Sequence, residues 1–437
     1  MTYKEALSYM EAIGGYGIVP GLDSIRALCG RIGNPQDMLR FIHVAGTNGK
    51  GSVTAYLSTI LRCAGYRVGS YVSPVLFSYR ERIAVNGRPI TQKALCQGVE
   101  LLRNACDEMT KEGMPHPTSF EVETALGFWY FQKTECDLVV LETGMGGGMD
   151  ATNVIPPPLA AVLTPISMDH MKFLGSTLGE IAAQKAGIIK TGCYVISARQ
   201  KEEVMEVIAR IAREKHCPLQ TADVDTASQI RYGIERQRFD YGGYRRLEIS
   251  LAGKCQIENA VLAVETTKAL EKHGICVKEK ALRQGLLQTL WPGRFTVVAK
   301  KPWFIVDGAH NKAGAEQLAQ SLALYFPQKR IIFIMGVLRD KDYTGMLAVT
   351  CQYADQIITV TPPENARALP AYDLAVEASL VHPNVTAADS LEEAVEMSYL
   401  LAEREDVILS FGSLSYLGRM IKIVEKRSQK GSKNDRS

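Results

Sequence analysis

The sequence predicts an α/β protein: a domain built on a doubly wound, mostly parallel sheet with a phosphate-binding loop, followed by a smaller Rossmann-like α/β domain. Short, continuously apolar segments such as 137–141 and 159–163 alternate with longer segments of helical spacing, which is typical of strands buried on both faces. A second series of the same kind begins near residue 303, and the 437 residues exceed the size of one ordinary core.

The first domain is predicted to span residues 1–295. Its beginning is expected to be helical up to residue 40, with a turn at 14–21. Strands are then expected at 41–45, 67–72, 137–141, 159–163 and 194–197, and helices at 53–64, 93–111, 120–132, 178–190 and 256–272. Charged and aromatic residues alternate over 231–249, which predicts antiparallel strands.

The second domain is predicted to span residues 296–437, because the segment Trp291-Pro292-Gly293-Arg294 interrupts the pattern before it restarts. Strands are expected at 303–306, 330–335, 356–360 and 406–410, and helices at 313–325, 343–348, 369–378, 391–401 and after 410. The basic run from Lys422 to Lys433 is rich in serine and lysine, and a disordered tail is expected over about 427–437.

Composition and charge narrow the possible partners and the cellular location of the protein. A net charge of +3 gives no electrostatic reason to expect a nucleic-acid partner. The beginning of the chain lacks the apolar core of a signal peptide, and no apolar run is long enough to predict a membrane span. The ten cysteines are scattered without a Cys-x-x-Cys pair, which favours free thiols in a reducing compartment. We therefore expect a cytoplasmic protein.

The run His-Val-Ala-Gly-Thr-Asn-Gly-Lys-Gly-Ser-Val at 43–53 joins an apolar strand to an apolar helix. Glycines let backbone N–H groups surround an anion, and the helix N-terminus attracts negative charge. Lys50 would reach the outer phosphates of a nucleotide, and Ser52 a magnesium ion. Gly51 separates the two, a departure from the usual phosphate-loop spacing. The alternative is an ordinary glycine-rich turn.

Four further residues are candidates for a role in the chemistry. Glu142 ends a buried strand, where a carboxylate beside the phosphate loop suits magnesium, although a helix cap or ion pair is an alternative. His170 alone does not distinguish a ligand from a structural histidine. Small and apolar residues flank Lys185, whose burial would favour a neutral, reactive amine, whereas a surface lysine is the simpler interpretation. Arg294 would meet phosphate, or form a hinge ion pair.

Taken in order, these motifs resemble the folylpolyglutamate synthase/dihydrofolate synthase family of the ATP-dependent Mur ligase superfamily. One segment alone is modest evidence, but the set keeps the family order across nearly the whole chain. The matching segments are 43–53, 71–74, 81–83, 118–121, 142–154, 168–170, 185–187, 256–260, 292–295 and 307–311. One departure is Cys255, since the family often has histidine at this position.

The resemblance implies ATP and Mg²⁺ as cofactors, and it implies roles for individual residues. Catalytic roles are implied for Lys50, Lys185, His170 and Arg294, with Lys185 carboxylated on its amine. Nucleotide contacts are implied for Asn48, Gly49, Lys50, Gly51, Ser52, Asn259, Arg294, Asp307 and His310. Metal ligation is implied for Ser73, Glu142 and His170, so that Ser52 would contact phosphate instead. Pterin contacts are implied for Val19, Pro20, Gly21, Leu22, Thr118, Ser119, Phe120, Met149, Asp150 and Ala151.

The implied activity is formation of an amide between L-glutamate and the carboxylate of a reduced folate, through an acyl phosphate, by a monomer. The matches in the pterin segments favour dihydropteroate as a second acceptor, and a monofunctional folylpolyglutamate synthase is the alternative. A nucleotide-binding switch without ligase activity belongs to a different class. Only 45 residues precede Gly46, too few for the nucleotide-sugar domain that other Mur ligases usually carry there.

Overall fold

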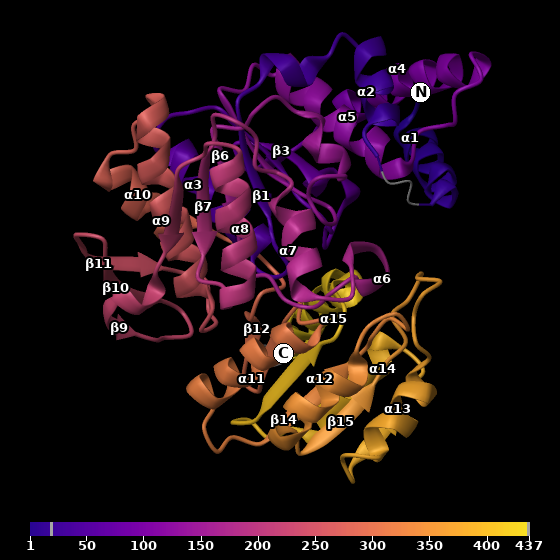
Figure 1. Cartoon of the computed structure of the whole chain (residues 1–437). Coiled ribbons are helices and arrows are strands. Elements are labelled where there is room, and N and C mark those ends of the chain that lie inside the picture. Colours follow the sequence, from indigo (N-terminus) through magenta and orange to yellow (C-terminus); the bar gives the residue numbers. More distant parts are fainter. Residues whose placement is uncertain (18–20, 435–437) are drawn as a thin grey trace.

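The computed structural model describes residues 1–17 and 21–434, and these residues form three β-sheets. The largest sheet and its helices lie in the upper part of Figure 1, and a six-stranded sheet with its own helices lies below them. Both sheets are mostly parallel, so the predicted α/β fold class is confirmed.

The largest sheet has the strand order β4-β3-β2-β5-β1-β6-β7-β8, in which β3 runs antiparallel to its neighbours β2 and β4 and the other neighbouring strands are parallel. Its strands are β1 (Phe41–Ala45), β2 (Val68–Tyr71), β3 (Ile83–Val85), β4 (Arg88–Pro89), β5 (Leu138–Glu142), β6 (Ala160–Leu163), β7 (Tyr194–Ala198) and β8 (Leu219–Ala222). Strands β5 and β6 flank β1, so the loops that follow these three strands meet at one edge of the sheet.

Helices cover both faces of this sheet because successive strand residues point to opposite sides. The first face packs on α3 (Lys50–Cys63), α9 (Gln256–Leu270) and α10 (Glu279–Gln288) through β1 residues Ile42 and Val44. The second face carries the remaining helices, α1 (Tyr3–Ala12), α2 (Asp23–Arg31), α4 (Gln92–Lys111), α5 (Ser119–Lys133), α6 (Met171–Leu174), α7 (Leu178–Ala186) and α8 (Glu202–Glu214). Phe41 and Ala45 face this side.

The predicted antiparallel strands form a small sheet of β9 (Ser228–Arg231), β10 (Gln237–Tyr241) and β11 (Tyr244–Ile249). The third sheet has the order β12-β13-β17-β14-β15-β16. Its strands are β12 (Thr296–Lys300), β13 (Trp303–Val306), β14 (Ile331–Met335), β15 (Gln356–Thr359), β16 (Val385–Ala387) and β17 (Val407–Phe411). The division at residue 295 stays a prediction; β12 begins at Thr296.

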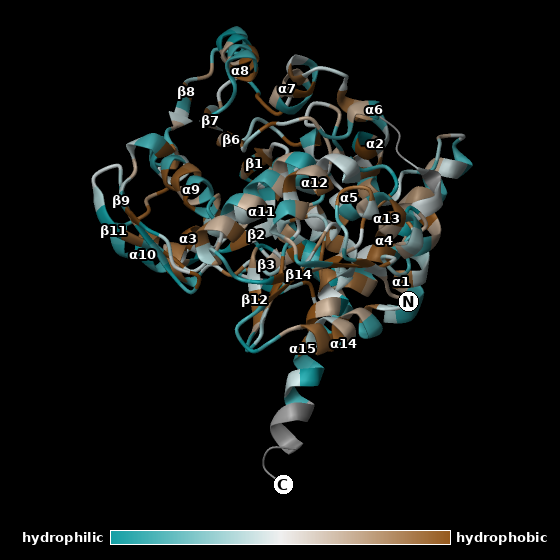
Figure 2. Ribbon diagram, turned by 90° about the horizontal axis from the view of Figure 1, so that it is seen from below, coloured by the Kyte–Doolittle hydropathy of each residue, from teal (hydrophilic) through white to brown (hydrophobic). Residues whose placement is uncertain are grey.

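Two helical layers enclose the third sheet. One consists of α11 (Lys312–Tyr325), α12 (Tyr343–Thr350) and α13 (Ala371–Ser379), and the other of α14 (Leu391–Leu401) and α15 (Leu414–Asn434). Figure 2 shows α15 projecting from the body of the protein. The helix ends at Asn434. The disordered tail expected over about 427–437 stays a prediction, and its last three residues lie outside the described part of the chain.

Other elements depart from the predicted boundaries. Helix α7 stops at Ala186 instead of 190, and Gly187 follows it. Helix α8 is absent from the predicted elements although Val204, Ile208 and Ala212 recur every four positions and are buried. In the part of the chain that the structure describes, no helix combines the length and the apolar character needed to cross a bilayer.

The buried His43 makes stability depend on pH. Its side chain is fully buried and its Nε2 lies 2.9 Å from the Thr152 Oγ1. Since that hydroxyl donates to the Asp150 carboxylate, His43 Nε2–H is the donor. Burial, assisted by the Lys190 charge, lowers the pKa of His43 to about 3. The unfolded chain therefore binds more protons than the folded chain between about pH 6.5 and pH 3.

We expect the free energy of unfolding to fall as the pH drops through this window, by on the order of 3 kcal/mol between pH 6.5 and 4 from His43 alone. Urea titrations of the wild type and His43→Gln measure this contribution as a difference in slope against pH. The exposed His216→Gln is the control and should keep the wild-type slope. Equal slopes in all three proteins would show that His43 is not held neutral.

Candidate active site

In the phosphate loop between β1 and α3, positions 49 and 51 are among those that require glycine. Gly49 has a φ of +90°, and a Cβ there would lie 2.5 Å from the Asn259 Oδ1. A Cβ on Gly51 would lie 2.7 Å from the Trp291 ring. The additional glycine after the lysine thus lets the indole of Trp291 pack on the first turn of α3. The backbone N–H groups at this helix start remain available to an anion.

Two lysine ammonium groups meet at one carbonyl oxygen of this loop. The Lys50 Nζ donates to the Gly46 oxygen at 3.2 Å and to the Thr47 oxygen at 3.3 Å. The Lys185 Nζ donates to the same Gly46 oxygen at 2.7 Å. Lys185 is only 4% exposed, so the interpretation as a surface lysine is wrong. Burial, with the Lys50 charge, lowers its pKa to about 7, and burial also lowers the pKa of Lys50.

Glu142, at the end of β5, lies close enough to Lys50 and Arg294 to interact with their charges. Burial raises its pKa to about 7, while Lys50 and Arg294 act in the opposite direction. The Ser73 backbone N–H hydrogen-bonds to this carboxyl group, but its Oε2 has no partner among the described residues. A buried carboxylate oxygen without a partner favours a cation beside it. The resemblance to the family also groups Glu142 with Ser73, and their joint role in metal binding stays a prediction.

His170 lies on the other side of the loop, at the start of α6. Its Nε2 is 3.9 Å from the Asp169 Oδ2, and so is the Nε2 of His310. The pKa of His170 is lowered by burial, against the opposing effect of Asp169, with Lys341, Lys185 and Lys50 contributing to the lowering. Burial lowers the pKa of His310 to about 4. Within residues 1–17 and 21–434, no group of three or more His, Cys, Asp or Glu side chains is arranged to hold a metal ion.

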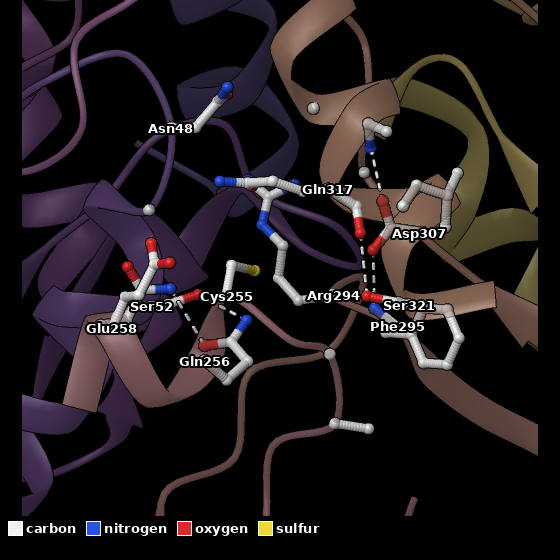
Figure 3. A pocket seen from close by; sticks show the side chains of 18 of the residues that line it. Asn48, Ser52, Cys255, Gln256, Glu258, Arg294, Phe295, Asp307, Gln317 and Ser321 are labelled. Atoms are coloured by element: carbon white, nitrogen blue, oxygen red, sulfur yellow. Dashed lines mark hydrogen bonds between the residues drawn. The ribbon is translucent and has the colours of Figure 1, made fainter. Parts of the chain in front are cut away.

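A pocket lies between the largest sheet with its helices and the third sheet with its helices, and it contains most of the residues predicted to bind the nucleotide (Figure 3). The Gln256 Nε2 donates to the Ser52 Oγ at 3.3 Å, and the Asn259 Nδ2 donates to the Gln256 Oε1 at 3.2 Å. Arg294 crosses the middle of the pocket toward the first layer. Among the lining residues are Asn48, Gly49, Ser52, Asn259, Arg294 and Asp307.

Sequence reasoning missed the wall that α11 contributes. Gln317 and Ser321 line the same pocket from this helix, one turn apart on one face. That spacing, after the predicted strand 303–306, was the available signal. Asp307 fixes the backbone on both sides of β12 and β13, because its carboxylate accepts hydrogen bonds from the Phe295 and Ala309 N–H groups, each at 2.8 Å.

A larger cavity of about 260 Å³ opens on the other side of Arg294. Ser73 and Glu142 lie on its wall together with Gly51, so the cavity reaches the phosphate loop. Aliphatic and aromatic side chains make much of the remaining lining, including Leu76, Phe77 and Trp291. A ligand in this cavity would reach Glu142 and Arg294, which both line it.

The segments predicted to contact the pterin fall into three groups. Val19 and Pro20 lie outside the described residues. Thr118 caps α5 through a hydrogen bond from the Glu121 N–H, and the Phe120 ring packs on Gly144. The Asp150 carboxylate is bound by the Met145 and Thr152 N–H groups, whereas Met149 is 53% exposed. Their contact with substrate stays a prediction, as it does for Gly21, Leu22, Ser119 and Ala151.

Comparisons with known proteins identify the class to which this fold and site belong. The Mur ligase middle domain matches residues 44–267, and the Mur ligase glutamate ligase domain matches residues 293–414. The chain thus belongs to the Mur ligase superfamily.

Full-length relatives narrow the class further. A dihydrofolate synthase/folylpolyglutamate synthase of Bacillus subtilis is 33% identical, with 95% of this chain and 97% of the relative covered. A folylpolyglutamate synthase of Lacticaseibacillus casei is also 33% identical, over 97% of this chain and 98% of the relative. The structure of Mycobacterium tuberculosis folylpolyglutamate synthase complexed with ADP superposes with a TM-score of 0.89 at 31% identity, covering 97% and 99% of the two chains. The chain belongs to the folylpolyglutamate synthase/dihydrofolate synthase family of ATP-dependent ligases.

Proposed function

We propose that this protein adds L-glutamate to the carboxylate of a reduced folate at the expense of ATP, and that it also joins dihydropteroate to a first glutamate. The observation that carries the proposal is the convergence of Lys50 and Lys185 on the Gly46 oxygen, with the buried Glu142 close enough to Lys50 to interact with its charge. The Lys50 ammonium beside the N–H groups at the start of α3 suits a polyphosphate, and the Glu142 carboxylate suits its metal ion.

We place the reaction at the junction of the nucleotide pocket and the larger cavity. Lys50 and Arg294 would neutralise charge that spreads over the transferred phosphoryl group. The substrate carboxylate would be converted to an acyl phosphate, and the glutamate amine would displace phosphate from it. No side-chain nucleophile is needed. Asn48, Asn259 and Asp307 would hold the nucleotide between the largest sheet and the third sheet. This enclosed position would also exclude water from the acyl phosphate.

We assign Mg²⁺ to the neighbourhood of Glu142. Its unpartnered Oε2 fits a cation that prefers oxygen, and the Ser73 hydroxyl lies on the same cavity wall. The third proposed ligand is His170. When bound, Mg²⁺ would neutralise part of the phosphate charge.

Removing the Ser73 hydroxyl or the His170 ring should weaken the dependence of activity on Mg²⁺. For Ser73→Ala and His170→Ala we expect half-maximal activity at Mg²⁺ concentrations several-fold above that of the wild type. Ser73→Ala keeps the backbone N–H that contacts Glu142, so it tests the hydroxyl alone. Ser78→Ala and His216→Ala are matched controls. Magnesium titrations that are unchanged in both test variants would remove these residues from the metal site.

Assays of the pure protein with tetrahydrofolate and dihydropteroate side by side, each with ATP, Mg²⁺ and glutamate, test the function. We expect glutamylated product and ADP from both acceptors. Product from tetrahydrofolate alone would leave a monofunctional folylpolyglutamate synthase. ATP hydrolysis that neither acceptor stimulates would favour a nucleotide-binding switch and contradict the proposal.

A further inference from the structure

The side chain of Asn311 uses all of its hydrogen-bonding capacity. Asn311 is 4% exposed and caps α11, its Oδ1 accepting from the Gly314 N–H at 2.8 Å. The same Oδ1 accepts from the Asn48 Nδ2 at 3.1 Å. Its Nδ2 donates to the Asn48 Oδ1 at 3.2 Å and to the Asp169 Oδ2 at 3.0 Å. A carboxamide offers two acceptor sites and two donors, so none is left over.

This amide joins three segments that are distant in sequence. Asn48 belongs to the phosphate loop after β1, Asp169 to the loop after β6, and Asn311 to the start of α11 beside the third sheet. The reciprocal amide pair spans 263 residues of sequence. Because Asn48 also lines the nucleotide pocket, whatever fixes its side chain fixes one wall of that pocket.

A second bond runs across the same junction. The Lys341 Nζ lies 2.9 Å from the Asp169 Oδ1, and both side chains are 9% exposed. Lys341 follows β14 and so belongs to the third sheet. The ion pair holds the Asp169 carboxylate in place as an acceptor for Asn311.

We infer that Asn311 is a positioning residue for the ligase reaction. Together with the Asp169–Lys341 ion pair, it holds the Asn48 side chain, and therefore the phosphate loop, against the start of α11 beside the third sheet. The inference rests on the proposed function, because it gives Asn311 a task in binding the nucleotide phosphates. Loss of this contact should affect nucleotide affinity and kcat. It should leave the KM for the folate unchanged, since the Asn311 side chain hydrogen-bonds to Asn48, Asp169 and Gly314, none of which is proposed to bind the pterin.

Asn311→Asp separates positioning from helix capping. Aspartate caps a helix as well as asparagine does, so the bond from the Gly314 N–H is kept. Its second oxygen, however, faces the Asn48 Oδ1 and the Asp169 carboxylate, where the wild type has a donor. Asn384→Asp is the matched control, because Asn384 also donates through Nδ2 but lies away from the site, at the start of β16.

We expect the dissociation constant for ADP, measured by calorimetry, to rise about tenfold or more in Asn311→Asp and to stay at the wild-type value in Asn384→Asp. The backbone N–H groups of residues 47–49 should exchange with deuterium faster, and kcat should fall with the KM for folate unchanged. ADP affinity and exchange equal to those of the control would overturn the inference.

A loss of folding is detected by the thermal midpoint. If the midpoint of Asn311→Asp falls, Asn311→Ser decides, because serine also caps the helix and brings no charge toward Asp169. Asn311→Ser should show the same weakened ADP binding, and wild-type binding there would contradict the inference. ADP binding and exchange do not require catalysis, so a wild type that binds ADP without glutamylating folate would refute the proposed function and leave this test intact.

Discussion

Lys50→Ala is expected to lower kcat by about 100- to 1000-fold while the thermal midpoint stays near that of the wild type. Among the described residues, the Lys50 ammonium hydrogen-bonds to the carbonyl oxygens of Gly46 and Thr47. Burial lowers its pKa and so makes the unliganded cation costly to hold. Removing it should therefore cost little stability, whereas the phosphoryl group loses a cation that lies against the phosphate loop.

Steady-state assays and thermal unfolding of the same preparations check this expectation. Lys215→Ala, at the exposed end of α8, is the control for loss of a positive charge and should retain wild-type turnover. If Lys50→Ala turns over at the wild-type rate, the assignment of 43–53 as the phosphate loop is wrong.

Lys185→Ala should also lose most activity, and short-chain carboxylates such as acetate should restore part of it. The reason lies in the pKa of about 7, which leaves a large fraction of the buried amine neutral at physiological pH. A neutral amine can react with CO₂ to form a carbamate, which turns the cation into an anion beside the proposed metal site. Alanine leaves space there for an added carboxylate.

If Lys185 is carboxylated, the activity of the wild type should depend on CO₂, whereas the activity of Lys185→Ala should not. Wild-type activity in CO₂-depleted buffer should fall, and bicarbonate should restore it more fully at pH 8 than at pH 6, because the neutral fraction of the Lys185 amine grows as the pH rises past 7. Lys190→Ala is a neighbouring control, since Lys190 donates to the Asn153 and Ile155 carbonyls and has no proposed carboxylate role. Rescue of both variants alike, or of neither, would contradict carboxylation of Lys185.

The functional residues at the strand ends of the largest sheet could be predicted because the residues that define them are neighbours in sequence. The segment 43–53 contains its own strand, glycines, lysine and helix, and Glu142 stands at the end of a continuous apolar run. Burial of Lys185 could not be settled from its neighbours, because small and apolar flanking residues occur on both buried and amphipathic surfaces. The carbonyl that it binds, Gly46, is 139 residues away in sequence.

Contacts between the layers are not encoded in any local pattern. Lys341 lies in a polar loop whose composition resembles any other turn, and only the folded chain brings it to Asp169, 172 residues earlier. Asn311 carries a recognisable helix-cap position, yet its second task at Asn48 depends on how the two sheets meet. The resemblance to a family supplied Ser73 and His170 as metal positions, which the residues themselves did not distinguish from structural ones.

The most direct test of the ligase mechanism follows one oxygen atom. Tetrahydrofolate labelled with oxygen-18 in its side-chain carboxylate is incubated with the protein, ATP, Mg²⁺ and glutamate, and the products are analysed by mass spectrometry. Formation of an acyl phosphate transfers one carboxylate oxygen to phosphate, so we expect one oxygen-18 atom in the inorganic phosphate for each glutamate added. Unlabelled phosphate, or phosphate released without a longer folate, would contradict the account.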